Sequence, residues 1–240
     1  MSKKYIVILR ASGIYSNNEL ENTLRNDFYS IKTFSILKVD PIHCKSINHS
    51  GAQAVLTTSS NAIHILSEIS KNRNITMYTV GSTSKKVAET LGYKNVIDCQ
   101  GDSVKMYEKV INNCSKNNGD LIYIGAESIS LDLPKMLSDV GYKVKRYIVY
   151  KTREVDVIDN KFFKLIEQKK IKWIVLLSKK GASSFNKLVI NNIKFNQLEN
   201  IKFACLSESI AKGLSEKVKL KFFPKHPTLN KLKSIIIQNE

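Results

Sequence analysis

Short apolar runs alternate with helical segments along the whole chain, and this alternation limits the possible folds more than any other feature. Runs such as YIVILR, QAVLTTS and DLIYIG have the length and the β-branched content of buried strands. Helical periods of roughly ten residues follow such runs. Strands that alternate with helices form parallel sheets with right-handed crossovers. The sequence therefore predicts the α/β class, with parallel sheets of the flavodoxin or Rossmann kind.

The spacing of apolar residues also places the helices. We expect them near residues 18–28, from 60 to about 71, over 83–91, near 131–140 and from about 181, with a further one in FACLSESIAKGL.

A weak internal repeat indicates two similar domains. AVLTTSSNAIHIL followed by YTVGSTSKKVAETLG resembles WIVLLSKKGASSFNKL followed by FACLSESIAKGL. The extended stretches FSILKVDPI and YIVYKTREV lie before and after the part of the chain that holds the first copy. We therefore expect a discontinuous domain of residues 1–38 and 153–240, with a second domain of residues 39–152 inserted between its two segments.

Composition excludes several classes of protein. With 240 residues, 42% of them hydrophobic, the chain can bury one large core or two modest ones. No window approaches the apolar run of about 18 residues that a membrane span needs, and the first residues enter a strand pattern at once. We expect a cytoplasmic protein that does not bind membranes. The four cysteines show no metal-ligand spacing, so we expect reduced thiols, no metal and no cofactor.

The formal net charge of +17 has two interpretations. A nucleic-acid binder would carry its lysines as a clustered stripe, and its binding would weaken steeply as salt rises. Here the lysines are spread over the whole chain. We therefore expect diffuse surface charge, part of which steers an acidic ligand, and no nucleic-acid partner.

Hydroxyl residues recur in the turns that follow four of the strand-like runs. In parallel α/β sheets, ligands bind beyond the carboxyl ends of the strands, where helix N-termini present free N–H groups. Any one of these residues is explained as an N-cap worth about 1 kcal/mol, but their recurrence indicates an anion site. No turn has the GxxxxGK[ST] or GxGxxG pattern, which disfavours nucleotides and favours a carboxylate-bearing ligand. The four residues are Ser59, Ser84, Ser178 and Ser209.

Several segments, in this order along nearly the whole chain, resemble the uroporphyrinogen-III synthase family. They are TTSSNAI, VGSTSKKVAETLG, LPKMLSDVGYKVKRYIVYKT and WIVLLSKKGASSF followed by CLSESIAKGL. The resemblance implies two α/β domains joined by a two-stranded connection, with the active site in the cleft between them. It also implies a cyclising hydro-lyase of haem biosynthesis that needs no cofactor.

The substrate implied by the resemblance is hydroxymethylbilane, a linear tetrapyrrole with eight carboxylates. The enzyme promotes loss of water and holds the chain bent, and the last pyrrole ring is inverted through a spiro intermediate. We expect a monomer that receives its substrate from the preceding deaminase. The rival interpretation from the residues alone is a non-catalytic two-domain binder of a small acidic ligand.

The resemblance also assigns residues. Tyr150 is the tyrosine of the family's Val-Tyr motif and would donate a hydrogen bond to the leaving hydroxyl, although packing at a strand end is the alternative. Arg10 would meet a propionate, or it is a solvated charge at a strand end. The segment GAESIS after Ile124 lacks the arginine often found there, and Lys85, Lys86 and Lys179 are candidates to compensate for it. The implied substrate-binding residues are Arg10, Thr58, Ser59, Ser60, Gly81, Ser82, Thr83, Ser84, Gly125, Ser178, Ser207 and Ser209.

Overall fold

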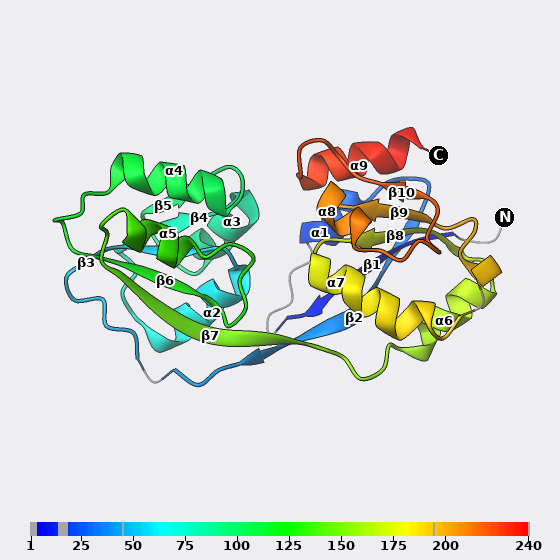
Figure 1. Cartoon of the computed structure of the whole chain (residues 1–240), viewed down its shortest axis with the longest axis horizontal. Coiled ribbons are helices and arrows are strands. Elements are labelled where there is room, and N and C mark those ends of the chain that lie inside the picture. Colours follow the sequence, from blue (N-terminus) through cyan, green and yellow to red (C-terminus); the bar gives the residue numbers. More distant parts are fainter. Residues whose placement is uncertain (1–3, 14–18, 45, 194, 240) are drawn as a thin grey trace. The chain divides into compact units, whose positions relative to one another are not determined.

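The computed structural model describes residues 4–13, 19–44, 46–193 and 195–239. Within it the chain forms two compact units (Figure 1). Unit 1 contains residues 1–38 and 153–240, and unit 2 contains residues 39–152. Helices alternate with strands in both units, as the periodicity predicts, and every strand pair with a described register is parallel. The predicted α/β class is therefore confirmed.

Unit 2 has its strands in the order β7-β6-β3-β4-β5. Counted along the chain, this is the order 3-2-1-4-5 of Rossmann-type sheets, with a change of direction between β3 and β6. The elements are β3 (Ala52–Thr57), α2 (Ser60–Ile69), β4 (Thr76–Thr79), α3 (Ser82–Thr90), β5 (Val96–Asp98), α4 (Ser103–Asn113), β6 (Asp120–Ala126), α5 (Leu133–Asp139) and β7 (Val144–Glu154).

Unit 1 has the order β10-β9-β8-β1-β2, which along the chain is the 2-1-3-4-5 order of flavodoxin-type sheets. Its change of direction lies between β1 and β8. The elements are β1 (Tyr5–Ser12), α1 (Glu19–Leu24), β2 (Ser30–Pro41), α6 (Asn160–Glu167), β8 (Ile171–Leu176), α7 (Lys179–Phe185), the π-helix η1 (Asn186–Ile190), the 3-10 helix η2 (Phe195–Gln197), β9 (Lys202–Cys205), α8 (Glu208–Lys212), β10 (Lys221–Phe222) and α9 (Leu229–Gln238).

The repeat seen in the sequence corresponds to equivalent positions in the two sheets. The first copy forms β3, α2, β4 and α3, and the second forms β8, α7, β9 and α8. In each unit these strands lie on one side of the direction change, with β6 and β7 in unit 2 and β1 and β2 in unit 1 on the other side. The two sheets therefore share one spatial order. β2 and β7 are neighbours in the strand order, and each runs from one unit into the other.

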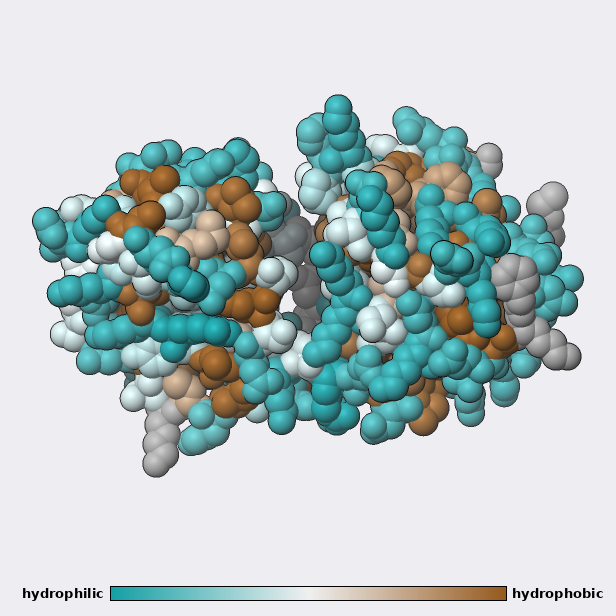
Figure 2. Space-filling view, in the orientation of Figure 1, coloured by the Kyte–Doolittle hydropathy of each residue, from teal (hydrophilic) through white to brown (hydrophobic). Residues whose placement is uncertain are grey.

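Both faces of the strands are covered, which explains why the strands read as continuous apolar runs. In β1, Val7 and Leu9 pack in the core that α6, α7 and α8 cover. Ile6 and Ile8 pack in the core that α1 and α9 cover. In unit 2, Leu121 and Tyr123 of β6 pack on the face that α4 and α5 cover. Figure 2 shows that hydrophilic residues occupy most of the visible face of both units, with apolar areas scattered between them.

One helix is shorter than predicted. The segment expected near residues 18–28 forms α1 only from Glu19 to Leu24, and Asn18 lies outside the described residues. The Asn26 side chain accepts hydrogen bonds from the N–H groups of Phe28 and Tyr29, and this turn ends the helix. None of the helices in the described part of the chain is both long and apolar enough to cross a membrane.

Candidate active site

The carboxyl ends of β3 and β6 define the candidate site, because they flank the direction change of unit 2. Leu56 of β3 pairs with Tyr123 of β6 in a parallel register. Thr58 and Gly125 each lie two residues beyond that pair, so the turns after these strands lie side by side. Ligands of open α/β sheets bind in the crevice at such a point. Residues that the sequence assigns to substrate binding thus come together at one edge of the sheet.

Hydroxyl and phenol side chains contact one another at this edge. Thr58 Oγ1 lies 3.3 Å from the Tyr123 hydroxyl, and Ser60 Oγ lies 3.2 Å from Ser84 Oγ. The Thr57 hydroxyl accepts a hydrogen bond from the Ser59 N–H at 3.3 Å. We call Thr58, Ser59, Ser60, Ser84, Tyr123 and Tyr150 the phenol–hydroxyl cluster. Its members come from the turns after β3 and β4 and from strands β6 and β7.

Tyr150 is a nearly buried titratable group of the cluster. It lies on β7, where it pairs with Ala126, and it is only 8% exposed. Burial raises the pKa of its phenol, the Ser59 side chain acts in the opposite direction through a hydrogen bond, and Tyr123 raises the pKa further. The phenol therefore stays protonated at neutral pH and is available as a hydrogen-bond donor. Whether it touches substrate stays a prediction.

Tyr123 is a member of the cluster that sequence reasoning missed. Its ring is almost fully buried, at 1% exposed, and its hydroxyl reaches Thr58. A Cβ atom at Gly125 would lie 3.0 Å from Cε1 of this ring, so the missing side chain at Gly125 makes room for it. The alternation of Leu121, Tyr123 and Gly125 on one strand face is the signal that could have found it.

The helix starts of unit 2 differ in detail from the predicted N-caps. Ser59 is the N-cap of α2, but its side chain makes no capping hydrogen bond. The N-cap of α3 is Gly81, so Ser82, Thr83 and Ser84 are the first helical residues. The expectation that Ser84 is an N-cap is therefore wrong. Its hydroxyl bonds to Ser60 instead, and its side chain is buried.

In unit 1, the predicted residues lie after β1, β8 and β9. Ser178 is the N-cap of α7, and its Oγ accepts a hydrogen bond from the Gly181 N–H at 3.0 Å. Ser207, not Ser209, is the N-cap of α8, and the two hydroxyls lie 3.0 Å apart. The expectation of an N-cap at Ser209 is wrong because α8 starts at Glu208, two residues earlier than that N-cap requires.

Arg10 near the end of β1 already has an acidic neighbour. Its Nη1 lies 3.5 Å from a carboxylate oxygen of Glu21 on α1, and both side chains are partly exposed. A partly solvated pair of this kind contributes little to stability. Among the described residues, no group of three or more His, Cys, Asp or Glu side chains could hold a metal ion.

One protein family matches most of the chain. The family model described as uroporphyrinogen-III synthase HemD matches residues 18–233. The fold is similar to the crystal structure of uroporphyrinogen-III synthetase from Helicobacter pylori 26695, with a TM-score of 0.65, 18% sequence identity and coverage of 98% of this chain and 100% of that one. A mutant uroporphyrinogen III synthase from Thermus thermophilus is more distant, with a TM-score of 0.48, 13% identity and coverage of 98% and 100%.

At these identities, the likeness to solved structures shows the fold alone. A comparison with curated proteins gave no match. The family model, however, spans most of the chain. The chain therefore belongs to the uroporphyrinogen-III synthase family, the cyclising lyases of tetrapyrrole biosynthesis.

Proposed function

We propose that this chain closes hydroxymethylbilane to uroporphyrinogen III and that Tyr150 donates the hydrogen bond that helps the hydroxyl group leave. The observation that carries this role is the protonated, nearly buried phenol within the phenol–hydroxyl cluster at the direction change of unit 2. As the C–O bond breaks, the Tyr150 phenol passes its proton to the leaving hydroxyl, which departs as water. The phenol regains a proton that the last pyrrole releases when the macrocycle has closed. A positioned acid of this kind contributes about 10²–10⁴ in rate.

The enzyme must also control the regiochemistry of ring closure, that is, which isomer forms. After water has left, the last pyrrole attacks through its substituted carbon, and the spiro intermediate reopens with that ring inverted. This reaction needs the two ends of the bilane held in contact geometry, which contributes up to about 7–11 kcal/mol in favourable cases. A strong base is not required, which agrees with a site built from hydroxyls and phenols.

The carboxylates of the substrate are proposed to bind at the hydroxyl turns. In unit 2 the free N–H groups at the starts of α2 and α3 suit anions, and Ser59, Ser60 and Ser82 to Ser84 surround them. In unit 1 we assign the same task to Arg10, Ser178, Ser207 and Ser209. A position of the active site between the two units stays a prediction.

Three further parts of the proposal come from the sequence. The spread of positive charge would steer the polyanionic substrate toward the protein. We further propose that the protein acts in the cytoplasm as a monomer. The unstable bilane would then pass to it from the preceding deaminase.

A coupled assay tests the proposed function. Porphobilinogen and a deaminase supply hydroxymethylbilane to the purified chain, and the oxidised products are separated by isomer. We expect the type III isomer to dominate. A product that contains only the type I isomer, as the bilane gives without help, would refute the proposal. A tight complex with the bilane and no turnover would favour the non-catalytic binder.

The role of Tyr150 is tested in the same assay by substitution. Tyr150→Phe removes the hydroxyl and keeps the ring, so we expect type III formation to slow by about 100-fold or more. Ser84→Ala removes one hydroxyl of the cluster that is not assigned to the leaving group, and its effect should be smaller. A Tyr150→Phe variant as fast as the wild type would remove Tyr150 from the mechanism.

A further inference from the structure

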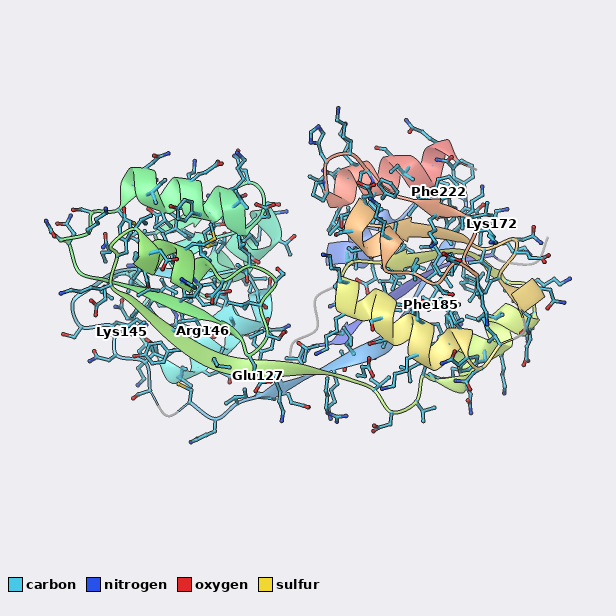
Figure 3. All side chains as sticks on the ribbon, viewed as in Figure 1. Glu127, Lys145, Arg146, Lys172, Phe185 and Phe222 are labelled. Atoms are coloured by element: carbon cyan, nitrogen blue, oxygen red, sulfur yellow. The ribbon has the colours of Figure 1, made fainter. Side chains whose placement is uncertain are left out.

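The guanidinium of Arg146 lies against the turn that follows β6. Its Nη2 donates hydrogen bonds to the carbonyl oxygens of Ala126 and Glu127, at 3.1 Å and 2.7 Å. Arg146 is the partner of Tyr123 in the register of β6 and β7. Burial raises the pKa of the Tyr123 phenol, and the charge of Arg146 acts in the opposite direction. The positive charge therefore lies next to the phenol–hydroxyl cluster. Figure 3 labels Arg146 and Glu127 in unit 2.

Among the described residues, no carboxylate pairs with this charge. Within the described residues, Arg146 forms no ion pair, and its side chain is exposed. In the described part of the chain, the hydrogen bonds of the guanidinium come from Nη2 and go to two backbone carbonyls, so the two N–H groups of Nη1 keep their capacity to donate. The Glu127 side chain next to it is also exposed and lies in no ion pair within the described part of the chain.

Lys145, the preceding residue, shows the contrasting case. Its ammonium lies 2.6 Å from an Asp120 carboxylate oxygen, and its side chain points to the opposite face of β7. Two adjacent cations on one strand thus have different surroundings. Lys145 is paired and faces away from the cluster, whereas Arg146 is unpaired within the described residues and faces it.

We propose that Arg146 binds a carboxylate of the substrate in unit 2 and holds the turn after β6 in place for that contact. This inference rests on the proposed function, and it supplies the cation that the segment GAESIS lacks. A guanidinium suits both tasks at once because its planar fork donates to two carbonyls and still presents further N–H groups to an anion. A lysine has one point charge and cannot do both equally well.

Three variants test the proposal in the full-length protein. Arg146→Gln removes the charge, Arg146→Lys keeps it without the fork, and Lys145→Gln is the matched loss of one charge on the other face. Two readouts are used: KM and kcat in the coupled assay, and binding of uroporphyrin III, a fluorescent tetrapyrrole with eight carboxylates. We expect Arg146→Gln to raise both KM and the Kd by about 10- to 100-fold. Arg146→Lys should be intermediate, and Lys145→Gln should stay within about twofold of the wild type.

Salt dependence separates a charge contact from a purely structural role. If Arg146 pairs with a carboxylate, the dependence of log Kd on log salt becomes shallower in Arg146→Gln and stays unchanged in Lys145→Gln. Equal slopes in wild type and Arg146→Gln, or equal losses for both charge deletions, would overturn the proposal. Thermal unfolding of each variant checks the fold, and if Arg146→Gln does not fold, Arg146→Lys carries the comparison.

The coupled assay and the binding measurement distinguish a failure of the Arg146 proposal from a failure of the proposed function. A wild type that makes the type III isomer while Arg146→Gln keeps its KM and Kd would refute the role of Arg146 alone. A wild type that makes no type III isomer but binds uroporphyrin III through Arg146 would refute the proposed function alone. If the wild type neither reacts nor binds, both proposals fail.

Discussion

Burial gives the Tyr150 phenol its proposed role, because it keeps the proton on the oxygen. The pKa of this phenol is raised above its ordinary value of about 10. Phenol ionisation therefore causes no marked loss of kcat between pH 6 and pH 9, and Tyr150→Phe should lower kcat by a constant factor over that range. A pH–rate profile of both proteins is the measurement. A falling limb with a midpoint below pH 9 that is present only in the wild type would contradict the assignment.

Substitution of Gly125 tests whether the position of the Tyr123 ring affects stability and activity. The Cβ of Gly125→Ala would lie 3.0 Å from Cε1 and 3.3 Å from the hydroxyl of Tyr123, whose ring is buried and cannot move freely. We expect a loss of about 1–3 kcal/mol in the free energy of unfolding, together with slower type III formation. Urea unfolding and the coupled assay measure these effects.

The comparison for that variant is Tyr123→Phe, which leaves the ring in place and removes only the contact with Thr58. It should cost activity with a smaller loss of stability. If Gly125→Ala is as active as the wild type, the packing of Tyr123 does not control the site.

At the residue scale, the sequence predicted the site residues that lie in turns and missed those that lie within strands. Thr58, Ser59 and Ser60 stand out because an N-cap explains one hydroxyl residue at a helix start but not three in a row. In the sequence, Tyr123 cannot be distinguished from an ordinary aromatic residue of the core. Arg146 reads as one of the 38 basic residues of a strongly charged chain. Only the pairing of β6 with β7 shows that Tyr123 and Arg146 lie opposite each other.

At the element scale, the start of α3 offers a test of ligand approach. Gly81 has an extended backbone, and a Cβ atom there would meet nothing within 4 Å. Gly81→Ala should therefore cost at most about 1 kcal/mol, because alanine is a poorer N-cap than glycine but meets no clash. If a substrate carboxylate binds at this helix start, the added methyl group obstructs it, and we expect KM to rise by about tenfold. An unchanged KM would remove the start of α3 from the binding surface.

Gly119→Ala is the control from the opposite end of the same sheet. Gly119 has a φ of +107°, and a Cβ atom there would collide with the carbonyl oxygen of Gly51. We expect a loss of more than about 2 kcal/mol, seen as a lower Tm. The two variants together separate steric effects on the fold from steric effects on the ligand.

The elements themselves were predictable, but their order in the sheets was not. Apolar runs bounded by Gly, Ser and Asn locate strands such as β3, β6 and β8, because buried parallel strands need that composition. The strand order depends on the sheet edge to which each crossover runs, and no local pattern encodes that choice. Helix α1 was overestimated because the Asn26 turn looks like ordinary helical spacing.

On the scale of the whole chain, the internal repeat of the sequence corresponds to a strand order that both units share. Both units place their strands in one spatial order, although β1 and β2 come first in the chain of unit 1 and β6 and β7 come last in unit 2. The same arrangement of turns therefore recurs. Ser178 and Ser207 follow β8 and β9 as Ser59 and Gly81 follow β3 and β4. A duplicated set of helix starts is suited to a ligand with many carboxylates.

Each unit has cores of its own and one deeply buried thiol. The unfolding of unit 1 and of unit 2 can therefore be followed separately. Cys99 lies in unit 2 and Cys205 in unit 1, and burial raises the pKa of each to about 12. At pH 8 only about 10⁻⁴ of either thiol is ionised, so a thiol reagent reaches them after unfolding. In a Cys44→Ser, Cys114→Ala variant, we expect different urea midpoints for labelling at Cys99 and Cys205, read by peptide mass spectrometry. Labelling in high urea, where both sites must react fully, is the control. Coincident midpoints would show that the two units unfold as one cooperative body.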